Sequence, residues 1–311
     1  MCNNAGKKAG KVNAAKFLSE RFYKFRPICK GMSPSDKYYV ETNNDRCFFV
    51  RIVDNTQSER FENEFKILQN AAQEGVSMPH PVEMGKFDCG RYMIIDWVDG
   101  ETLYDALPSM TRDKQHKLGI KAGEIMRKIH SIPMINNSNE WAMCPYFKMK
   151  TNIAKYPEYA ANFTDVENRL IDYIELNKEL LQSYPFVLLH GDYSPMNMML
   201  ESGELKIIDF NSFGFGVPWI DMGKIISKAM GNEYFYLGLI HSYFDGEPSQ
   251  DSWKLIAFYA ALHRIDTFFN SAIYERSSIH IVSNNEFSGW FDDMKNFVPS
   301  WYLHADESFI R

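Results

Sequence analysis

The chain has 311 residues, 45% of them hydrophobic and 24% charged, and a formal net charge of −6. This composition is typical of a globular protein, and the length predicts two lobes or two small domains, since one core rarely serves so many residues. The negative charge argues against a nucleic-acid partner, which needs a basic binding face. No apolar run is long enough to cross a membrane, so we expect no membrane association.

The start of the chain and its cysteines indicate the compartment. The first sixteen residues, MCNNAGKKAGKVNAAK, lack the apolar core of a secretory signal. The five cysteines are odd in number, widely spaced and free of C-x-x-C pairs, a pattern that fits neither a disulfide framework nor a structural zinc site. We therefore expect a cytoplasmic protein with reduced cysteines.

The first hundred or so residues predict a helix followed by a small sheet. A possible helix, AAKFLSERFYKF, precedes two strand-like runs, KYYVET and RCFFVRIV, which are separated by the turn residues NND. The segment SERFENEFKILQNAAQEG has apolar residues at helical spacing and ends at Gly75. A second hairpin, VEMGKF and RYMIID, turns at residues 88 to 90. This order predicts an antiparallel sheet with two helices.

The rest of the chain is predicted to be mainly helical. Apolar residues recur at helical spacing in two long segments, residues 111–130 and 162–184. Three further helices are expected over residues 218–228, 233–244 and 252–270. Their apolar stripes predict a helical core rather than a ligand site.

Between these helices lies the most specific pattern of the chain, FVLLHGDYSPMNMMLESGELKIIDF, which begins at Phe186. Two short apolar runs each end in polar residues, with ESGE as the hairpin turn, so Asp192, Asn197 and Asp209 are expected at strand ends. A carboxylate can accept the proton of an attacking hydroxyl, while an amide oxygen and a second carboxylate can hold magnesium against nucleotide phosphates. The alternative is that these residues only form turns, where Asp, Asn and Gly are common.

The order H-G-D-x-x-x-x-N followed by I-I-D-F resembles the aminoglycoside phosphotransferase and choline kinase-like family, which has a protein kinase-like fold. The resemblance implies a two-lobed α+β fold. A small antiparallel-sheet lobe, residues 1–98, would bind the nucleotide, and a larger, mainly helical lobe, residues 99–311, would hold the catalytic and acceptor sites.

The resemblance also assigns roles within this pattern. Asp192 would be the catalytic base, and Asn197 and Asp209 would bind Mg²⁺. His190 and Asp221 would support the catalytic turn, although Asp221 could equally be a first-turn helix charge.

The nucleotide contacts follow from the same resemblance. The loop GMSPSD stands where a kinase has its glycine-rich loop, and with one glycine it would use hydroxyls such as that of Ser33. Arg51 would replace the usual phosphate-pairing lysine, unless it is an edge-strand arginine in water. Glu64, in preference to Glu62, would pair with Arg51. The adenine site is expected at Ile95, Asp96 and Val98.

These features predict an ATP- or GTP-dependent, Mg²⁺-requiring kinase of a small-molecule hydroxyl. A cationic acceptor of the aminoglycoside antibiotic type is favoured, which would make the protein a resistance enzyme; a macrolide or a metabolite such as choline, methylthioribose or homoserine is the alternative. A non-catalytic nucleotide-binding module is a further alternative. Expected acceptor contacts are Asp266 and Glu275. Because Asp266 lies in a mostly apolar helix, it needs a partner, either an acceptor ammonium or Arg264 or His263.

Overall fold

The computed structural model describes residues 11–29, 35–87, 90–133, 144–181, 184–227, 229, 231–273, 284–305 and 309. The chain packs as two compact units: Met1–Glu101 with Met199–Asn211, and Thr102–Met198 with Ser212–Arg311. The expected domains, residues 1–98 and 99–311, stay a prediction. The structure adds that residues 199–211 pack with the first unit, which the sequence did not indicate.

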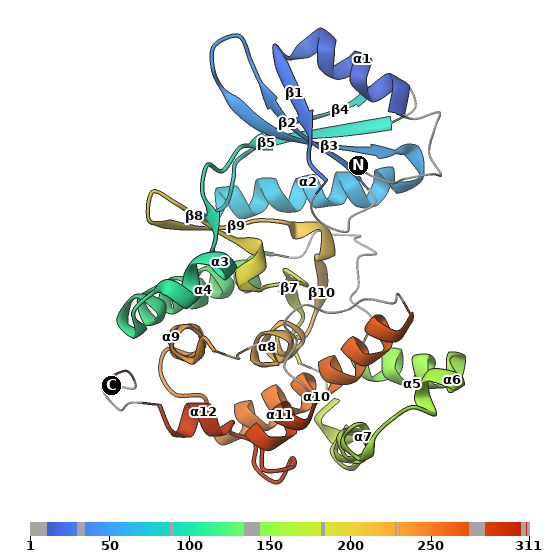
Figure 1. Ribbon diagram of the computed structural model, residues 1–311, viewed down its shortest axis with the longest axis vertical. Helices are drawn as coiled ribbons and strands as arrows, with labels where there is room; N and C mark the ends of the chain where they lie inside the picture. Colours follow the sequence, from blue (N-terminus) through green and yellow to red (C-terminus); the bar gives the residue numbers. More distant parts are fainter. Residues whose placement is uncertain are drawn as a thin grey trace. The chain divides into compact units, whose positions relative to one another are not determined.

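The first unit is built on a five-stranded antiparallel sheet with strand order β1-β2-β3-β5-β4 (Figure 1). Two helices, α1 (Lys11–Arg21) and α2 (Ser58–Gln73), accompany it, and a short 3-10 turn, η1 (Asn55–Gln57), leads into α2. The strands are β1 (Lys24–Pro27), β2 (Asp36–Glu41), β3 (Cys47–Asp54), β4 (Pro81–Phe87) and β5 (Gly90–Asp96).

The two faces of this sheet differ in what they bury. Alternate residues of β3, Phe48, Val50 and Ile52, join Leu18 of α1 in one hydrophobic core. The residues between them face the other way, and there Arg51 meets Glu64 of α2. In Figure 1 the strands accordingly pass between α1 and α2. The alternation of side chains along β3 therefore leaves one face of the sheet for polar chemistry.

A second, smaller sheet has the strand order β6-β8-β9, with β6 at Glu101–Thr102, β8 at Met198–Glu201 and β9 at Glu204–Ile207. Its hairpin is bonded to the first unit. The hydroxyl of Ser77 donates to the carbonyl of Leu205 at 2.7 Å, and the main-chain carbonyl of Ser77 accepts from the amide of Ile207 at 2.9 Å. Arg60 of α2 donates to the carbonyl of Asn211, in the 3-10 turn η5 (Phe210–Ser212), at 2.9 Å. These bonds explain why residues 199–211 belong to that unit.

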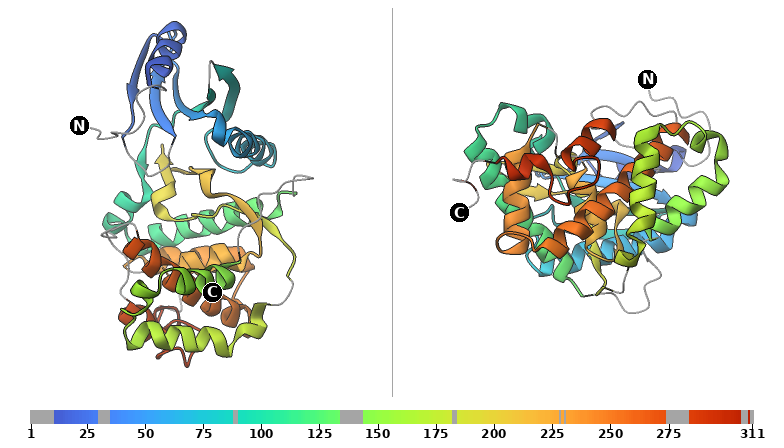
Figure 2. Two further views of the ribbon diagram at one scale, coloured as in Figure 1. Left: turned by 90° about the vertical axis from the view of Figure 1, so that its right-hand side faces the viewer. Right: turned by 90° about the horizontal axis from the view of Figure 1, so that it is seen from below.

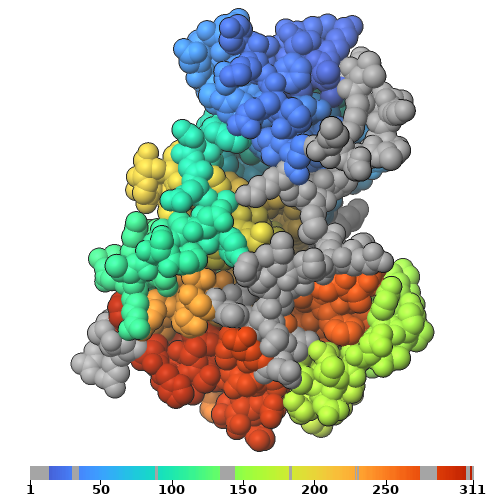
Figure 3. Space-filling model, in the orientation of Figure 1, coloured from blue at the N-terminus to red at the C-terminus, as the bar shows by residue number. Residues whose placement is uncertain are grey.

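The second unit is helical, as expected. Helix α4 (Arg112–Ser131) packs along α9 (Glu233–Phe244) (Figure 2). Helix α10 (Gln250–Ile273) packs against α8 (Trp219–Ile226), α5 (Pro145–Lys155) and α7 (Asp165–Leu176). Helix α7 also contacts α11, and these light-green and red segments adjoin on the surface in Figure 3. The predicted helix over residues 162–184 is shorter than expected, because α7 ends at Leu176 and a 3-10 turn follows.

The bounds of these elements are α3 (Leu103–Ala106), α4 (Arg112–Ser131), α5 (Pro145–Lys155), α6 (Pro157–Ala160), α7 (Asp165–Leu176), α8 (Trp219–Ile226), α9 (Glu233–Phe244), α10 (Gln250–Ile273), α11 (Asn284–Trp290) and α12 (Ser300–Leu303). The 3-10 turns are η2 (Leu107–Ser109), η3 (Lys178–Leu181), η4 (Pro195–Asn197) and η5 (Phe210–Ser212). Two short strands, β7 (Val187–Leu189) and β10 (Gly214–Gly216), pair antiparallel.

Helices α8 and α10 approach each other unusually closely at Gly223. A Cβ atom built on this glycine would overlap the main-chain carbonyl of Tyr259 in α10. Any larger residue must push the two helices apart, so the glycine determines their separation.

Among the residues that the structure describes, no helix is long and apolar enough to cross a membrane. Cys47 and Cys144 are free thiols, whereas Cys29 is disulfide-bonded. The expectation that all cysteines are reduced is therefore wrong for Cys29.

Candidate active site

The H-G-D segment follows β7 as a tight turn that a buried carboxylate holds in place. The amides of His190 and Gly191 donate to the two oxygens of Asp221, at 2.9 and 3.0 Å. Asp221 lies in the first turn of α8 and is fully buried. Gly191 has a φ of +79°, and a Cβ there would overlap the carbonyl oxygen of Ser212. The turn therefore needs glycine, and it presents Asp192 next.

The charge state of Asp221 follows from its neighbours. Burial acts to raise its pKa, but hydrogen bonding and charge from His130, with further charge from Lys224 and His190, leave the pKa below its usual value. His130 lies 3.4 Å from the carboxylate through Nε2, and its Nδ1 is 2.7 Å from the hydroxyl of Tyr243. Asp221 is thus an ionised acceptor at neutral pH, suited to holding backbone amides.

Asn197 fixes the orientation of Asp192. Its amide nitrogen donates to the main-chain carbonyl of Asp192 at 2.8 Å and to the Oδ2 of the same residue at 2.9 Å. The amide of Asp192 in turn donates to Nδ1 of His190 at 3.2 Å. With its nitrogen engaged, Asn197 has its side-chain oxygen left as the atom suited to a cation.

Asp209 belongs to the first unit and comes two residues after β9. Its φ of +65° is left-handed, a conformation that Asp tolerates better than most residues. In the described part of the chain, no group of three or more His, Cys, Asp or Glu side chains could hold a metal. Magnesium commonly takes one or two protein ligands and completes its shell with phosphate oxygens and water, and a carboxylate with an amide oxygen fits that chemistry.

Arg51 and Glu64 form a buried ion pair on the polar face of the first sheet. Only 7% of Arg51 and 3% of Glu64 is exposed. The guanidinium also lies 3.4 Å from the hydroxyl of Ser35 and stacks over the ring of Phe61, 5.4 Å from its centroid. Burial raises the pKa of Glu64, and the charge of Arg51 offsets this only in part.

The remaining nucleotide-site predictions fall in or just after β5. Ile95 pairs with Phe49 in the register of β3 and β5, so it lies on the same sheet face as Arg51. Val98 is buried, and the amide of Asp96 donates to the carbonyl of His80 at 2.9 Å. Glu62, the alternative partner for Arg51, instead pairs with Arg91. Ser33 lies outside the described residues.

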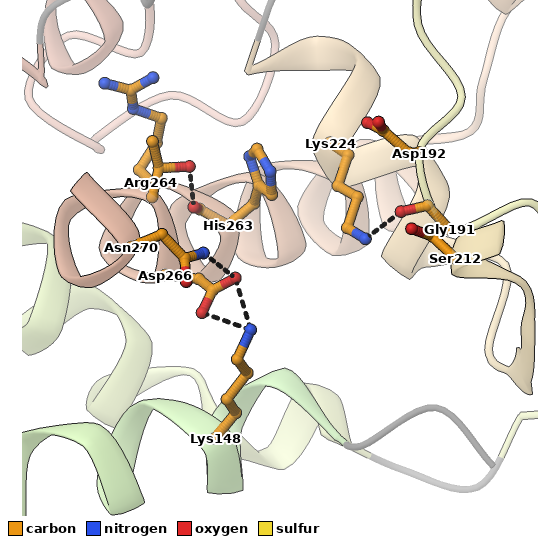
Figure 4. A pocket seen from close by; sticks show the side chains of 10 residues that line it. Lys148, Gly191, Asp192, Ser212, Lys224, His263, Arg264, Asp266 and Asn270 are labelled. Carbon is orange, nitrogen blue, oxygen red and sulfur yellow. Dashed lines mark hydrogen bonds and ion pairs between the residues drawn. The ribbon is translucent and has the colours of Figure 1, made fainter. Parts of the chain in front are cut away.

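Asp192 borders a cavity of about 420 Å³ in the second unit. Figure 4 shows Lys224 of α8 pointing to the carbonyl of Gly191, to which it donates a hydrogen bond. The other wall comes from α10 and from Lys148 of α5. The α10 residues are His263, Arg264, Asp266, Thr267 and Asn270.

Asp266 already has protein partners in this cavity. Lys148 places its ammonium 2.7 and 2.8 Å from the two carboxylate oxygens, and Asn270 donates at 3.2 Å (Figure 4). The expected partners were therefore wrong: His263 bonds to Ser227 at 2.7 Å, and the guanidinium of Arg264 points away from Asp266. Glu275 lies outside the described residues.

Two lysines of this cavity were missed by sequence reasoning. Lys224 follows Asp221 by one helical turn, so the periodicity of the predicted helix could have placed the two side by side. Lys148 lies in α5, a helix that the sequence did not predict, and no local signal pairs it with Asp266.

Comparison with known proteins decides the family. The model described as "Phosphotransferase enzyme family" matches residues 24–259, well over half of the chain. The chain belongs to this phosphotransferase family. The family expected from the H-G-D-x-x-x-x-N pattern is thus confirmed, while no curated protein sequence matches this phosphotransferase.

Solved structures confirm the protein kinase-like fold of this phosphotransferase. Amicoumacin kinase in complex with AMP-PNP and Ca²⁺ is 13% identical, with a TM-score of 0.64 over 94% of this chain and 96% of that one. An ADP-bound aminoglycoside phosphotransferase is 17% identical, with a TM-score of 0.62 over 95% and 99%. A choline/ethanolamine kinase family protein from Mesorhizobium loti is 16% identical, with a TM-score of 0.60 over 96% and 94%. Identities this low show the fold alone.

Proposed function

We propose that this phosphotransferase is a nucleotide-dependent kinase that phosphorylates a hydroxyl group of a small molecule, with ATP or GTP as donor and Mg²⁺ as cofactor. One observation carries the proposal. Asp192 is oriented by Asn197 on a turn anchored through Asp221, and it borders a cavity large enough for a small molecule. A base fixed beside an acceptor cavity is what hydroxyl phosphorylation requires.

In the proposed reaction Asp192 accepts the proton of the acceptor hydroxyl. The acceptor oxygen bonds to the γ-phosphorus as the bond from that phosphorus to the bridging oxygen breaks, and the nucleoside diphosphate leaves. Asn197 keeps the carboxylate aimed, since it bonds both the side chain and the backbone of Asp192. Asn197 and Asp209 would hold Mg²⁺, which neutralises charge on the phosphates.

The nucleotide would lie on the polar face of the first sheet. Arg51, held by Glu64, would belong to the phosphate site, with Ser33 in the covering loop. The adenine would contact the main chain at Asp96 and Val98 and pack on Ile95, the residue that shares a sheet face with Arg51. The ADP and AMP-PNP complexes of proteins with this fold support the nucleotide assignment.

The favoured acceptor is a cationic, aminoglycoside-type antibiotic. The net charge of −6 would steer a polycation towards the protein. Asp266 and Glu275 remain the proposed contacts for its ammonium groups. Aminoglycoside phosphotransferases are among the solved structures of similar fold.

A second acceptor class is favoured by the charges in the cavity. Lys148 already neutralises Asp266, and Lys224 brings a second ammonium close to Asp192. The ammonium groups of these lysines would repel a polycation, which would have to displace them to reach Asp266. A macrolide or a metabolite with fewer positive charges would meet less repulsion. Homoserine and methylthioribose are examples of this class.

The test is a panel of candidate acceptors assayed for nucleotide consumption, with Asp192→Asn as the matched inactive control. We expect one acceptor class to stimulate consumption in the wild type only. Expression in a susceptible host then separates the two classes: resistance to an aminoglycoside supports the first, and a folded, nucleotide-binding protein that confers none supports the second. Stimulation that is equal in the Asp192→Asn control would contradict the proposed base.

A further inference from the structure

Lys37 of β2 lies directly opposite Arg51 of β3. The antiparallel register pairs these residues and pairs their neighbours Tyr38 with Val50. Val50 and Tyr38 belong to the hydrophobic core under α1, so Lys37 and Arg51 share the opposite, polar face. Side chains paired in this way have Cβ atoms about 5 Å apart. The sheet therefore carries two cations side by side.

Of the two cations, Arg51 is committed to the protein. It is buried, ion-paired with Glu64, bonded to Ser35 and stacked over Phe61. A guanidinium held on several sides is rigid, and it would have to give up Glu64 to turn fully towards a ligand. These contacts are typical of a side chain that holds its neighbours in place rather than of one that binds a ligand.

Lys37 has a different environment. It is half-buried, and its side-chain ammonium makes no hydrogen bond or ion pair with the described residues. The pKa of Lys37 is lowered, mainly by burial and also by the charge of Arg51. The carboxylates of Asp209 and Glu64 offset this only in part. The ammonium therefore lies within electrostatic reach of Asp209, the residue that we propose as a metal ligand.

Two like charges opposite each other in a sheet are unfavourable unless anions compensate them. Glu64 compensates Arg51 directly, whereas Asp209 would be shared with a magnesium ion whenever one is bound. The face would then hold an excess of positive charge centred on Lys37. Phosphate oxygens are the anions that suit a compact ammonium on a flexible stem.

We propose that Lys37 contacts the nucleotide phosphates directly, and that Arg51 is a positioning residue that Glu64 holds behind it. The inference rests on the proposed function, in that it takes a nucleotide to be the ligand of this face. It assigns to β2 the phosphate contact that the resemblance had placed on β3.

The test is calorimetry of the full chain with ATP, GTP and adenosine, each with and without magnesium. We expect Lys37→Ala to weaken binding of the preferred triphosphate tenfold or more while leaving adenosine affinity unchanged, and Lys37→Arg to recover part of the loss. The matched control is Lys24→Ala, because Lys24 of β1 lies on the sheet face that carries Lys37 but pairs with Glu41 at an exposed position. It should bind all ligands as the wild type does.

The outcomes separate this inference from the proposed function. Triphosphate affinity unchanged in Lys37→Ala, or lost equally for adenosine, overturns the role of Lys37 while the kinase proposal stands. An equal loss in Lys24→Ala overturns it too, because a general charge effect would then explain both. If the wild type binds nucleotide but phosphorylates no acceptor, the kinase proposal is contradicted, while the nucleotide affinities of the Lys37 variants still test the role of Lys37. A wild type that binds no nucleotide overturns both.

Discussion

Two buried carboxylates organise the two units, and they respond to burial in opposite ways. Asp221 accepts two backbone amides and lies beside His130, and its pKa falls despite complete burial. Glu64 has one guanidinium partner, and its pKa rises. For Asp221 the hydrogen bond and charge of His130, with further charge from Lys224 and His190, outweigh desolvation, whereas for Glu64 the charge and hydrogen bond of Arg51 do not. The turn that carries Asp192 is thus held by a carboxylate that stays ionised, whereas the polar face of the first sheet is held by one that is more easily protonated.

The same comparison separates two kinds of function. The turn carries Asp192, whose proposed work is done in the transition state, while the sheet face carries Arg51 and Lys37, whose proposed work is ground-state binding. Variants of the turn should therefore change kcat, and variants of the sheet face should change nucleotide affinity.

The largest effect is expected for Asp192→Asn. Asn keeps the shape but cannot accept the proton, so kcat should fall by roughly 10²- to 10⁴-fold, the usual worth of general-base catalysis. Nucleotide affinity and folding should stay near wild type. Steady-state kinetics with an identified acceptor, together with calorimetry, measure both. Turnover at the wild-type rate would exclude Asp192 as the base, and lost nucleotide binding would mark it as structural or metal-linked.

Next in size is Asp209→Ala, which removes a proposed metal ligand from the first unit. Affinity for Mg-ATP and Mg-GTP should fall by about 10²-fold, since even an outer-shell partner is commonly worth 10- to 100-fold in metal affinity. Binding measured in EDTA should change much less. If the magnesium-dependent gain in affinity persists in the variant, the metal assignment is wrong.

A smaller effect is expected for Arg51→Ala, which should raise the nucleotide KM by about tenfold or more. Arg51→Lys should recover part of this. Thermal melting belongs beside the kinetics, because the variant leaves Glu64 buried without its cation. A wild-type KM in the alanine variant would show that the ion pair has no part in nucleotide binding.

The smallest effect concerns pH. Because the pKa of Asp221 is lower in the folded than in the unfolded chain, its contribution to stability is present above the unfolded value, about 4. It is lost as the pH falls through the folded pKa. Asp221→Asn should therefore melt at a lower temperature at neutral pH and show a gentler acid limb than the wild type. The exposed Asp113→Asn is the control, and identical acid limbs in all three proteins would refute this assignment.

Local patterns allowed the prediction of the turn and of the sheet. The alternation of side chains in β3 follows from its residues alone, whereas the pairing of Glu64 with Arg51 was expected only from the resemblance to kinases. The family and the fold followed from the spacing of Asp192, Asn197 and Asp209.

Contacts between distant segments were not predictable in the same way. The ion pair of Lys148 with Asp266 joins α5 to α10, 118 positions apart, and neither segment carries a signal for the other. Lys37 was overlooked because its meaning depends on the register of two strands, and a shift of one residue would move it to the other face.

The close approach of α8 and α10 at Gly223 bears on how acceptor choice could change. Helix α8 carries Asp221 and Lys224, which hold the amide and carbonyl sides of the catalytic turn, and α10 carries the opposite wall of the cavity. Gly223, which does not line the cavity, thus lies at the contact between the two helices that form its walls. Substitutions along this helix contact, outside the residues that line the cavity, offer a route to a cavity for bulkier molecules that leaves Asp192 in place.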